Sequence, residues 1–113
     1  MASIYLMGHS MGGRMASAYV AENSDHLLSG LIVAGCRNNG GRPLSCKENL
    51  EEVDIPVLDI WGGKNDKDAI AAYYREELAS EKYQQMKVSG VNHSFDDYEG
   101  EFVSSVVSWL KKQ

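Results

Sequence analysis

Four short stretches typical of strands alternate with segments of helical periodicity along the chain. Residues 3–7, 27–36 and 55–61 are apolar runs, the first of them β-branched and aromatic, which is typical of buried strands. Residues 84–90 have an alternating pattern, which also predicts a strand. Strands that alternate with helices predict a parallel sheet, because parallel neighbours need a crossover across one face of the sheet. The sequence therefore predicts an α/β fold with about four parallel strands and flanking helices.

The helical segments lie between these runs. Apolar spacing predicts a helix from Met11 to about Asn23 or Ser24, and Ser45 with Glu48 forms a capping-box pattern before a short helix over residues 46–52. Longer helices are expected over residues 68–80 and 99–112. Their expected apolar faces are Ile70, Tyr73, Tyr74 and Leu78 in the first, and Phe102, Val103, Val106, Trp109 and Leu110 in the second.

Length and charge limit the possible functions. The 113 residues are enough for one domain, over residues 1–113, and the net charge of −5 argues against nucleic acid and anionic membranes as partners. No apolar run approaches the roughly 20 residues that span a bilayer. We therefore expect a cytoplasmic protein without a membrane segment.

The two cysteines give little sign of a special role. Cys36 and Cys46 have no CxxC spacing and no histidine or cysteine cluster around them, so we expect no metal site. Free thiols are the favoured interpretation, and a disulfide between the two is the alternative.

The stretch GHSMG, from Gly8 to Gly12, has the pattern G-x-S-x-G between a predicted strand and a predicted helix. Such a sharp turn holds the middle residue, Ser10, in strained backbone geometry and leaves room only for small residues two positions away on each side. The free N–H groups of the following helix favour negative charge beside Ser10, and the Met11 N–H is the first candidate oxyanion donor. A glycine-rich turn without catalytic function, or a phosphate-binding loop, is the alternative.

The chain resembles the carboxyl-terminal half of an α/β-hydrolase. In that family a serine, an acid and a histidine occur in this chain order, and each follows a different strand. The stretches GGKND (residues 62–66) and GVNHSF (residues 90–95) follow the third and fourth strands, so the resemblance implies Asp66 as the acid and His93 as the base. Asp68 and Asp59 are the competing acids. His9, inside the turn, is expected to pack or line a pocket.

The resemblance implies acyl transfer on a small ester or related acyl compound, without a cofactor. Ser10 would attack the carbonyl, His93 would carry the proton, and Asp66 would orient His93. The family's sheet has about twice this much chain, and a loop in the missing part gives its second oxyanion donor. We therefore expect weak or partner-dependent esterase activity.

The missing half also leaves the first strand at the edge of the sheet. The strand from Ser3 to Met7 is apolar and has no Lys or Pro to discourage pairing. We expect a homodimer in which two such strands pair antiparallel and complete the sheet. Two alternatives stay open: a non-catalytic homodimeric assembly or ligand-binding module, and a chain that is a piece of a longer reading frame.

Overall fold

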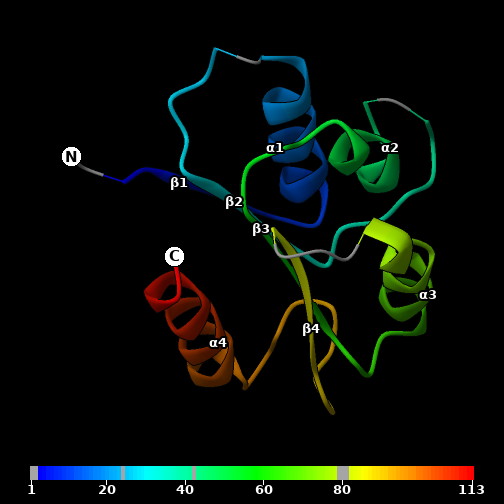
Figure 1. The fold of residues 1–113 in the computed structure, drawn as a ribbon. Coiled ribbons are helices and arrows are strands. Elements are labelled where there is room, and N and C mark those ends of the chain that lie inside the picture. The colour runs from blue at the N-terminus through cyan, green and yellow to red at the C-terminus, as the bar shows by residue number, and fades with distance from the viewer. Residues whose placement is uncertain (1–2, 24, 42, 79–81) are drawn as a thin grey trace.

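A parallel sheet of four strands, in the order of the chain, is the frame of the molecule (Figure 1). The computed structural model describes residues 3–23, 25–41, 43–78 and 82–113. The strands are β1 (Tyr5–His9), β2 (Gly30–Ala34), β3 (Val57–Gly62) and β4 (Tyr83–Val88). Each pairs in parallel with the next, which confirms the predicted sheet.

In the described residues, four α-helices connect and follow the strands. They are α1 (Met11–Glu22), α2 (Cys46–Glu51), α3 (Asp66–Tyr74) and α4 (Glu99–Lys111), and a short 3-10 turn, η1 (Glu76–Leu78), follows α3. Ser45 caps α2 by accepting the Glu48 N–H at 3.3 Å, as the capping pattern predicted. The helix expected over residues 68–80 begins two residues earlier, and residues 79 and 80 lie outside the described part. None of the described helices is long and apolar enough to cross a bilayer.

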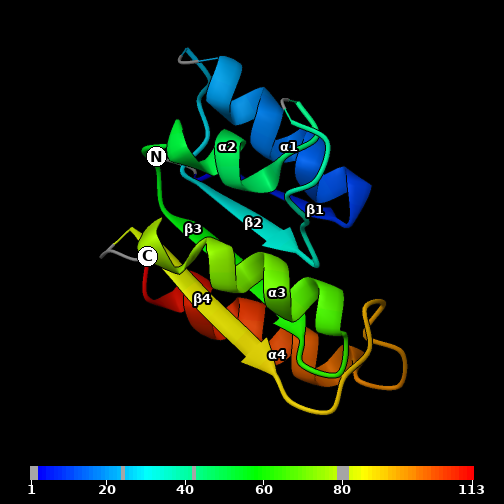
Figure 2. The same ribbon diagram turned by 90° about the vertical axis from the view of Figure 1, so that its right-hand side faces the viewer.

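The helices cover the two faces of the sheet unequally (Figure 2). Of the helices in the described residues, α1, α2 and α3 lie on one face and α4 lies on the other. A hydrophobic core lies on each face of the sheet, and alternate residues of β2 belong to one or the other. Leu31 and Val33 pack toward α1 and α2, whereas Ile32 and Ala34 pack toward α4. All four are at most 2% exposed, as expected for a strand covered on both faces.

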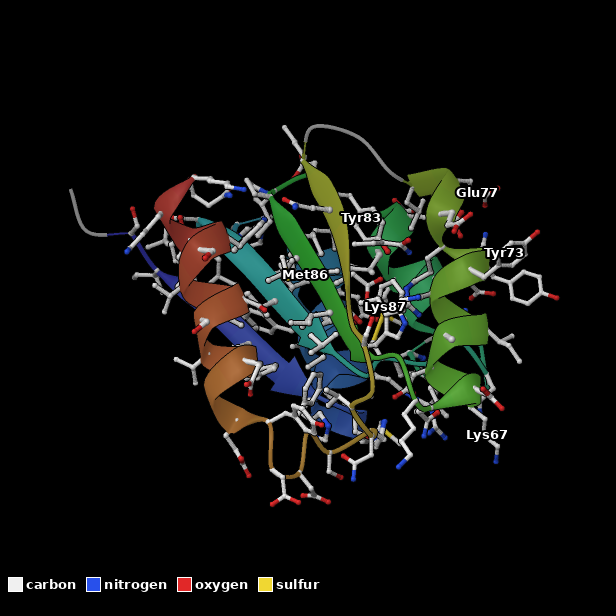
Figure 3. The ribbon with its side chains drawn as sticks, turned by 90° about the horizontal axis from the view of Figure 1, so that it is seen from below. Lys67, Tyr73, Glu77, Tyr83, Met86 and Lys87 are labelled. Atoms are coloured by element: carbon white, nitrogen blue, oxygen red, sulfur yellow. A yellow bond between two sulfur atoms is a disulfide. The ribbon has the colours of Figure 1, made fainter. Side chains whose placement is uncertain are left out.

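Helix α3 does not bury the apolar face that the sequence predicted. Ile70, Tyr73 and Tyr74 are 57–65% exposed, and Figure 3 shows Tyr73 pointing away from the sheet. The buried residues of α3 and its C-cap are Asp68, Ala71, Ala72 and Arg75. The predicted face was wrong because this helix docks on the sheet through charged groups and small side chains.

Arg75 and Asp59 form a fully buried ion pair between α3 and β3. The Arg75 Nε and Nη2 groups donate to the two Asp59 oxygens at 2.6 and 2.8 Å, and Nη1 donates to the Cys36 carbonyl and to Asn38 Oδ1 at 2.8 Å. The Tyr83 hydroxyl also donates to Asp59. Burial alone would lower the pKa of Arg75, but the adjacent Asp59 carboxylate raises it above its ordinary value. The guanidinium therefore stays charged at neutral pH.

Burial, and then the Asp59 charge, raise the pKa of the Tyr83 hydroxyl well above its ordinary value, so this donor keeps its proton.

Cys36 and Cys46 are joined by a disulfide, so the favoured interpretation of free thiols was wrong. Their Cα atoms lie 6.0 Å apart, within the range that a disulfide spans, and both side chains are buried. The bridge joins the end of β2 to the start of α2. It closes the loop between them, which carries Arg37 and Asn38.

The buried ion pair gives a testable stability prediction. R75M leaves the Asp59 carboxylate buried without its countercharge, so we expect the free energy of unfolding to fall by about 3–5 kcal/mol. In D59N/R75M no charge is left unpaired, so the loss should be smaller than the sum of the two single losses. Urea unfolding measures both. R14M removes an arginine whose side chain, among the described residues, bonds to Asn39, and should cost less than about 1 kcal/mol. An R75M loss as small as that of R14M would contradict the prediction.

Candidate functional site

Ser10 lies in the sharp turn between β1 and α1. Its backbone angles are φ 56° and ψ −120°, a conformation that a residue with a side chain rarely adopts. Its N–H donates to the Ala34 carbonyl at the end of β2 at 2.8 Å, and its carbonyl accepts the Gly13 and Arg14 N–H groups at 3.0 and 3.2 Å. The surrounding hydrogen bonds hold the strained conformation that the sequence predicted for this residue.

Gly8 and Gly12, on either side of Ser10, differ in whether a side chain would fit at their position. A Cβ on Gly8 would overlap the backbone of Gly12 and lie 2.7 Å from the Gly13 nitrogen. A Cβ on Gly12 would meet no other group within 4 Å. The expected need for a small residue therefore holds for Gly8, but not for Gly12.

A continuous chain of hydrogen bonds joins Ser10, His93 and Asp68. The Ser10 Oγ lies 3.0 Å from His93 Nε2, and His93 Nδ1 lies 2.5 Å from Asp68 Oδ2. An ionised carboxylate can only accept, so Nδ1 carries the proton of a neutral His93. This leaves Nε2 free to accept the Ser10 hydroxyl proton.

Asp68, and not Asp66, is the acid beside His93. Helix α3 begins at Asp66, which is exposed, and Asn65 is its N-cap, accepting the Asp68 N–H at 2.9 Å. Asp68 lies two residues further along this first turn, on the buried side of the helix, and is 0% exposed. The helix starts earlier than predicted, and this turns Asp66 to solvent and Asp68 to the sheet edge. The N-terminal end of the helix also stabilises the Asp68 carboxylate.

Two residues at the end of β2 complete this arrangement, and the sequence analysis missed both. Arg37 Nε donates to the other Asp68 oxygen, Oδ1, at 2.9 Å. Gly35 has φ 59°, and a Cβ there would lie 2.9 Å from the His93 ring and 3.3 Å from Asp68 Oδ2. The position of Gly35 directly after a buried strand was a sequence signal that could have pointed to it. No such signal marked Arg37, because it stands in a loop of polar residues and glycine.

His9 and Met11 flank Ser10 in the chain. The His9 Nε2 lies 2.8 Å from the His93 carbonyl oxygen, and the two imidazole rings are 5.0 Å apart. His9 therefore packs on the loop that holds His93 and lines a cavity, as expected. Met11 is the first residue of α1, so its N–H is one of the first-turn amides that have no acceptor within the helix.

A cavity of about 370 Å³ lies beside this site, between the end of β1 and α4. Its wall is mainly apolar and includes residues just before Ser10 and just after His93. The apolar part of the wall comprises Met7, Ala34, Phe95, Phe102 and Val103. Among the described residues, no group of three or more histidine, cysteine or acidic side chains is placed to hold a metal ion.

The sequence matches the model of the alpha/beta hydrolase family over residues 1–102. This match covers most of the chain, and the chain therefore belongs to the alpha/beta hydrolase family. Among curated proteins, none matches the sequence.

Solved structures of hydrolases have the same fold. Est1E from Butyrivibrio proteoclasticus, with ferulic acid bound, superposes with a TM-score of 0.79 at 14% identity, over 100% of this chain and 60% of that one. A predicted CIB-like hydrolase from Thermoplasma acidophilum gives 0.75 at 24% identity, over 99% and 52%. Dienelactone hydrolase from Anabaena variabilis gives 0.72 at 20% identity, over 94% and 46%. The chain thus spans about half to three-fifths of these structures.

The two glycines beside Ser10 provide a matched pair of substitutions. G8A places a methyl group against the Gly12 backbone, so we expect the free energy of unfolding to fall by about 1–3 kcal/mol. G12A adds a methyl group to open space on a helix, so it should leave stability unchanged or raise it by up to about 1 kcal/mol. Thermal and urea unfolding of both variants measure the difference. Equal losses in the two variants would show that Gly8 is not the constrained position.

Proposed function

We propose that this chain is a serine hydrolase that cleaves small esters through Ser10, His93 and Asp68. The observation that carries the proposal is the unbroken hydrogen-bonded chain from the Ser10 hydroxyl through both nitrogens of His93 to the buried Asp68 carboxylate. Membership of the alpha/beta hydrolase family and the structural likeness to solved hydrolases support the same class of reaction.

Each residue takes a role that follows from its position. His93 Nε2 accepts the Ser10 proton while Oγ attacks the ester carbonyl, and it then returns that proton to the leaving alcohol. Asp68 holds the Nδ1 proton in place and stabilises the imidazolium that forms. The Met11 N–H, at the start of α1, donates to the developing oxyanion. Water then hydrolyses the acyl-serine by the same proton transfers.

The apolar cavity between β1 and α4 favours esters with an uncharged aliphatic or aromatic part. Its volume of about 370 Å³ suits a small group of this kind. Glu99 also lines the cavity, and its carboxylate disfavours a negatively charged substrate. One oxyanion donor in place of two costs roughly 10²–10³ in rate, so we expect slow turnover by the chain alone.

The proposal is tested by labelling with a fluorophosphonate probe and by hydrolysis of p-nitrophenyl acetate. The wild type should be labelled on Ser10, and S10A should not. D68N should lower kcat by roughly 10³–10⁴, because an amide cannot hold His93 in the required tautomer. D66N is the matched control, and its kcat should stay within about twofold of the wild type, because Asp66 faces solvent. If the folded wild type is not labelled, the proposal is wrong and a non-catalytic module is the better interpretation.

We also propose that two copies associate through the free edge of β1. Within the described residues β1 pairs with β2 alone; Ile4, just before the strand, and Met7, within it, are 52% and 53% exposed. An apolar edge strand with unpaired backbone groups is a template for another strand. The occupant we propose is a second copy, because a two-fold axis perpendicular to the sheet sets like elements against each other: β1 on β1, α1 on α1 and α4 on α4.

The helices beside β1 support this choice. Helix α1 presents an exposed apolar stripe, which comprises Met11, Met15 and Tyr19. The two sides of α4 differ in polarity. The side near β1 carries Phe102 and Val103, which line the cavity beside Met7, with Glu99 at the start of the helix, whereas the side near β4 carries Gly100, Glu101, Ser104 and Ser105. The exposed apolar side chains of β1, α1 and this side of α4 give two copies an apolar surface on which to pack.

Sedimentation velocity at about 10 µM tests the association. Val107 lies one turn after Val103 on α4 and is 40% exposed. The wild type should sediment as two chains, and M15K/V107K as one, because each copy would then bring two cations into the contact. Y73K is the matched control: Tyr73 is 65% exposed on α3, away from β1, so this variant should stay dimeric. A monomeric wild type, a monomeric Y73K, or a stable complex with a different polypeptide in place of the second copy would each contradict the proposal.

A further inference from the structure

The Asp68 carboxylate has two different partners, one on each oxygen. Oδ2 faces His93 Nδ1 at 2.5 Å, and Oδ1 accepts from Arg37 Nε at 2.9 Å. The Asp68 side chain is 0% exposed and that of Arg37 is 28% exposed. A buried carboxylate is costly to keep ionised unless a countercharge lies beside it. Arg37 carries a permanent charge, whereas His93 is charged only when it is protonated, so Arg37 is the countercharge that Asp68 has in either state of His93.

The segment that carries Arg37 is anchored on both sides. The Arg37 carbonyl accepts the Cys46 N–H at 2.9 Å, and the neighbouring Cys36 is bonded to Cys46 by the disulfide. On the other side Asn38 Nδ2 donates to the Ala71 carbonyl of α3 at 2.9 Å. A surface ion pair usually contributes little because both side chains move. This pair differs, because the backbone of Arg37 is fixed to α2 and its neighbour is fixed to α3.

From this geometry we propose that Arg37 is a positioning residue for the reaction. Its Nε–H fixes the rotation of the Asp68 carboxylate, so that Oδ2 points at His93 Nδ1 and the imidazole in turn points Nε2 at Ser10. Within the described part of the chain, the Arg37 guanidinium forms a hydrogen bond with Asp68 and none with His93 or Ser10, so it acts through Asp68. The inference deepens the proposed function, and its kinetic consequence rests on that function. The effect of Arg37 on the hydrogen bond between Asp68 and His93 is independent of turnover.

Two readouts on R37M test the inference. The first is kcat for p-nitrophenyl acetate, which should fall by about 10–100-fold with little change in KM, because a misplaced catalytic group costs rate and leaves substrate binding intact. The second is the low-field proton NMR resonance of the His93 Nδ1–H, which should shift or disappear by exchange. R37K restores a cation beside Asp68, and should recover part of both signals.

R14M is the matched control for R37M. Arg14 donates to the side chain and carbonyl of Asn39, in the same loop as Arg37, and its loss changes the charge by the same amount without touching Asp68. We expect R14M to keep the kcat and the low-field resonance of the wild type. Equal effects in R14M and R37M, or wild-type values in R37M, would overturn the inference.

The outcomes separate this inference from the proposed function. If the wild type neither labels nor turns over, the proposed function fails, and the NMR comparison still decides whether Arg37 orders the bond between Asp68 and His93. If R37M does not fold, R37K is compared instead. It keeps the charge but lacks the Nε–H geometry, so its kcat should lie roughly 3–10-fold below the wild type. An R37K protein equal to the wild type in kcat and in the low-field resonance would overturn the inference.

Discussion

The arrangement of the site depends on the buried guanidinium of Arg75. It ties α3 to β3 through Asp59 and to the end of β2 through the carbonyl of Cys36. Asp68 stands seven residues before Arg75 along the same helical segment, about two turns away. Fixing one end of α3 on the sheet therefore determines where the other end places the Asp68 carboxylate. An ion pair outside the candidate site thus sets the geometry inside it.

The parts of the fold that were predicted correctly depend on local signals. The alternation of apolar runs and helical periods predicted four parallel strands, and the strand-turn-helix pattern around Ser10 predicted its strained backbone. His93 was predicted from the resemblance to the α/β-hydrolase family, and it lies in the loop after the fourth strand, beside Ser10. The acid was harder to predict. Asn65, Asp66 and Asp68 all suit a helix start, and the choice between the two aspartates depends on which side of the first turn meets the sheet.

The face of α3 and the disulfide could not be predicted for a related reason. Apolar spacing identifies the buried face of a helix only where the buried residues are apolar. On α3 the buried side carries Asp68 and Arg75 with two alanines. The partner that makes Arg75 stable there, Asp59, is 16 residues away in sequence and on another element. Likewise, ten residues separate Cys36 from Cys46, and this spacing alone does not fix the distance between their Cα atoms. Both features follow from tertiary contacts.

Under the proposed function, activation of the serine and binding of the ester depend on different regions of the protein. The proton path from Ser10 through His93 to Asp68 is formed within one chain, and Arg37 and Arg75 hold it from the side away from β1. The wall of the cavity and any second oxyanion donor lie toward the free edge of β1, where Met7 and Val103 stand beside the opening. Activation of the serine is therefore a property of the single chain, whereas stabilisation of the oxyanion and binding of the ester depend on what covers β1. A reactive phosphonate needs mainly an activated serine, whereas an ester also needs stabilisation of the oxyanion and binding in the cavity. Labelling of Ser10 and ester turnover therefore respond differently when the free edge of β1 is covered.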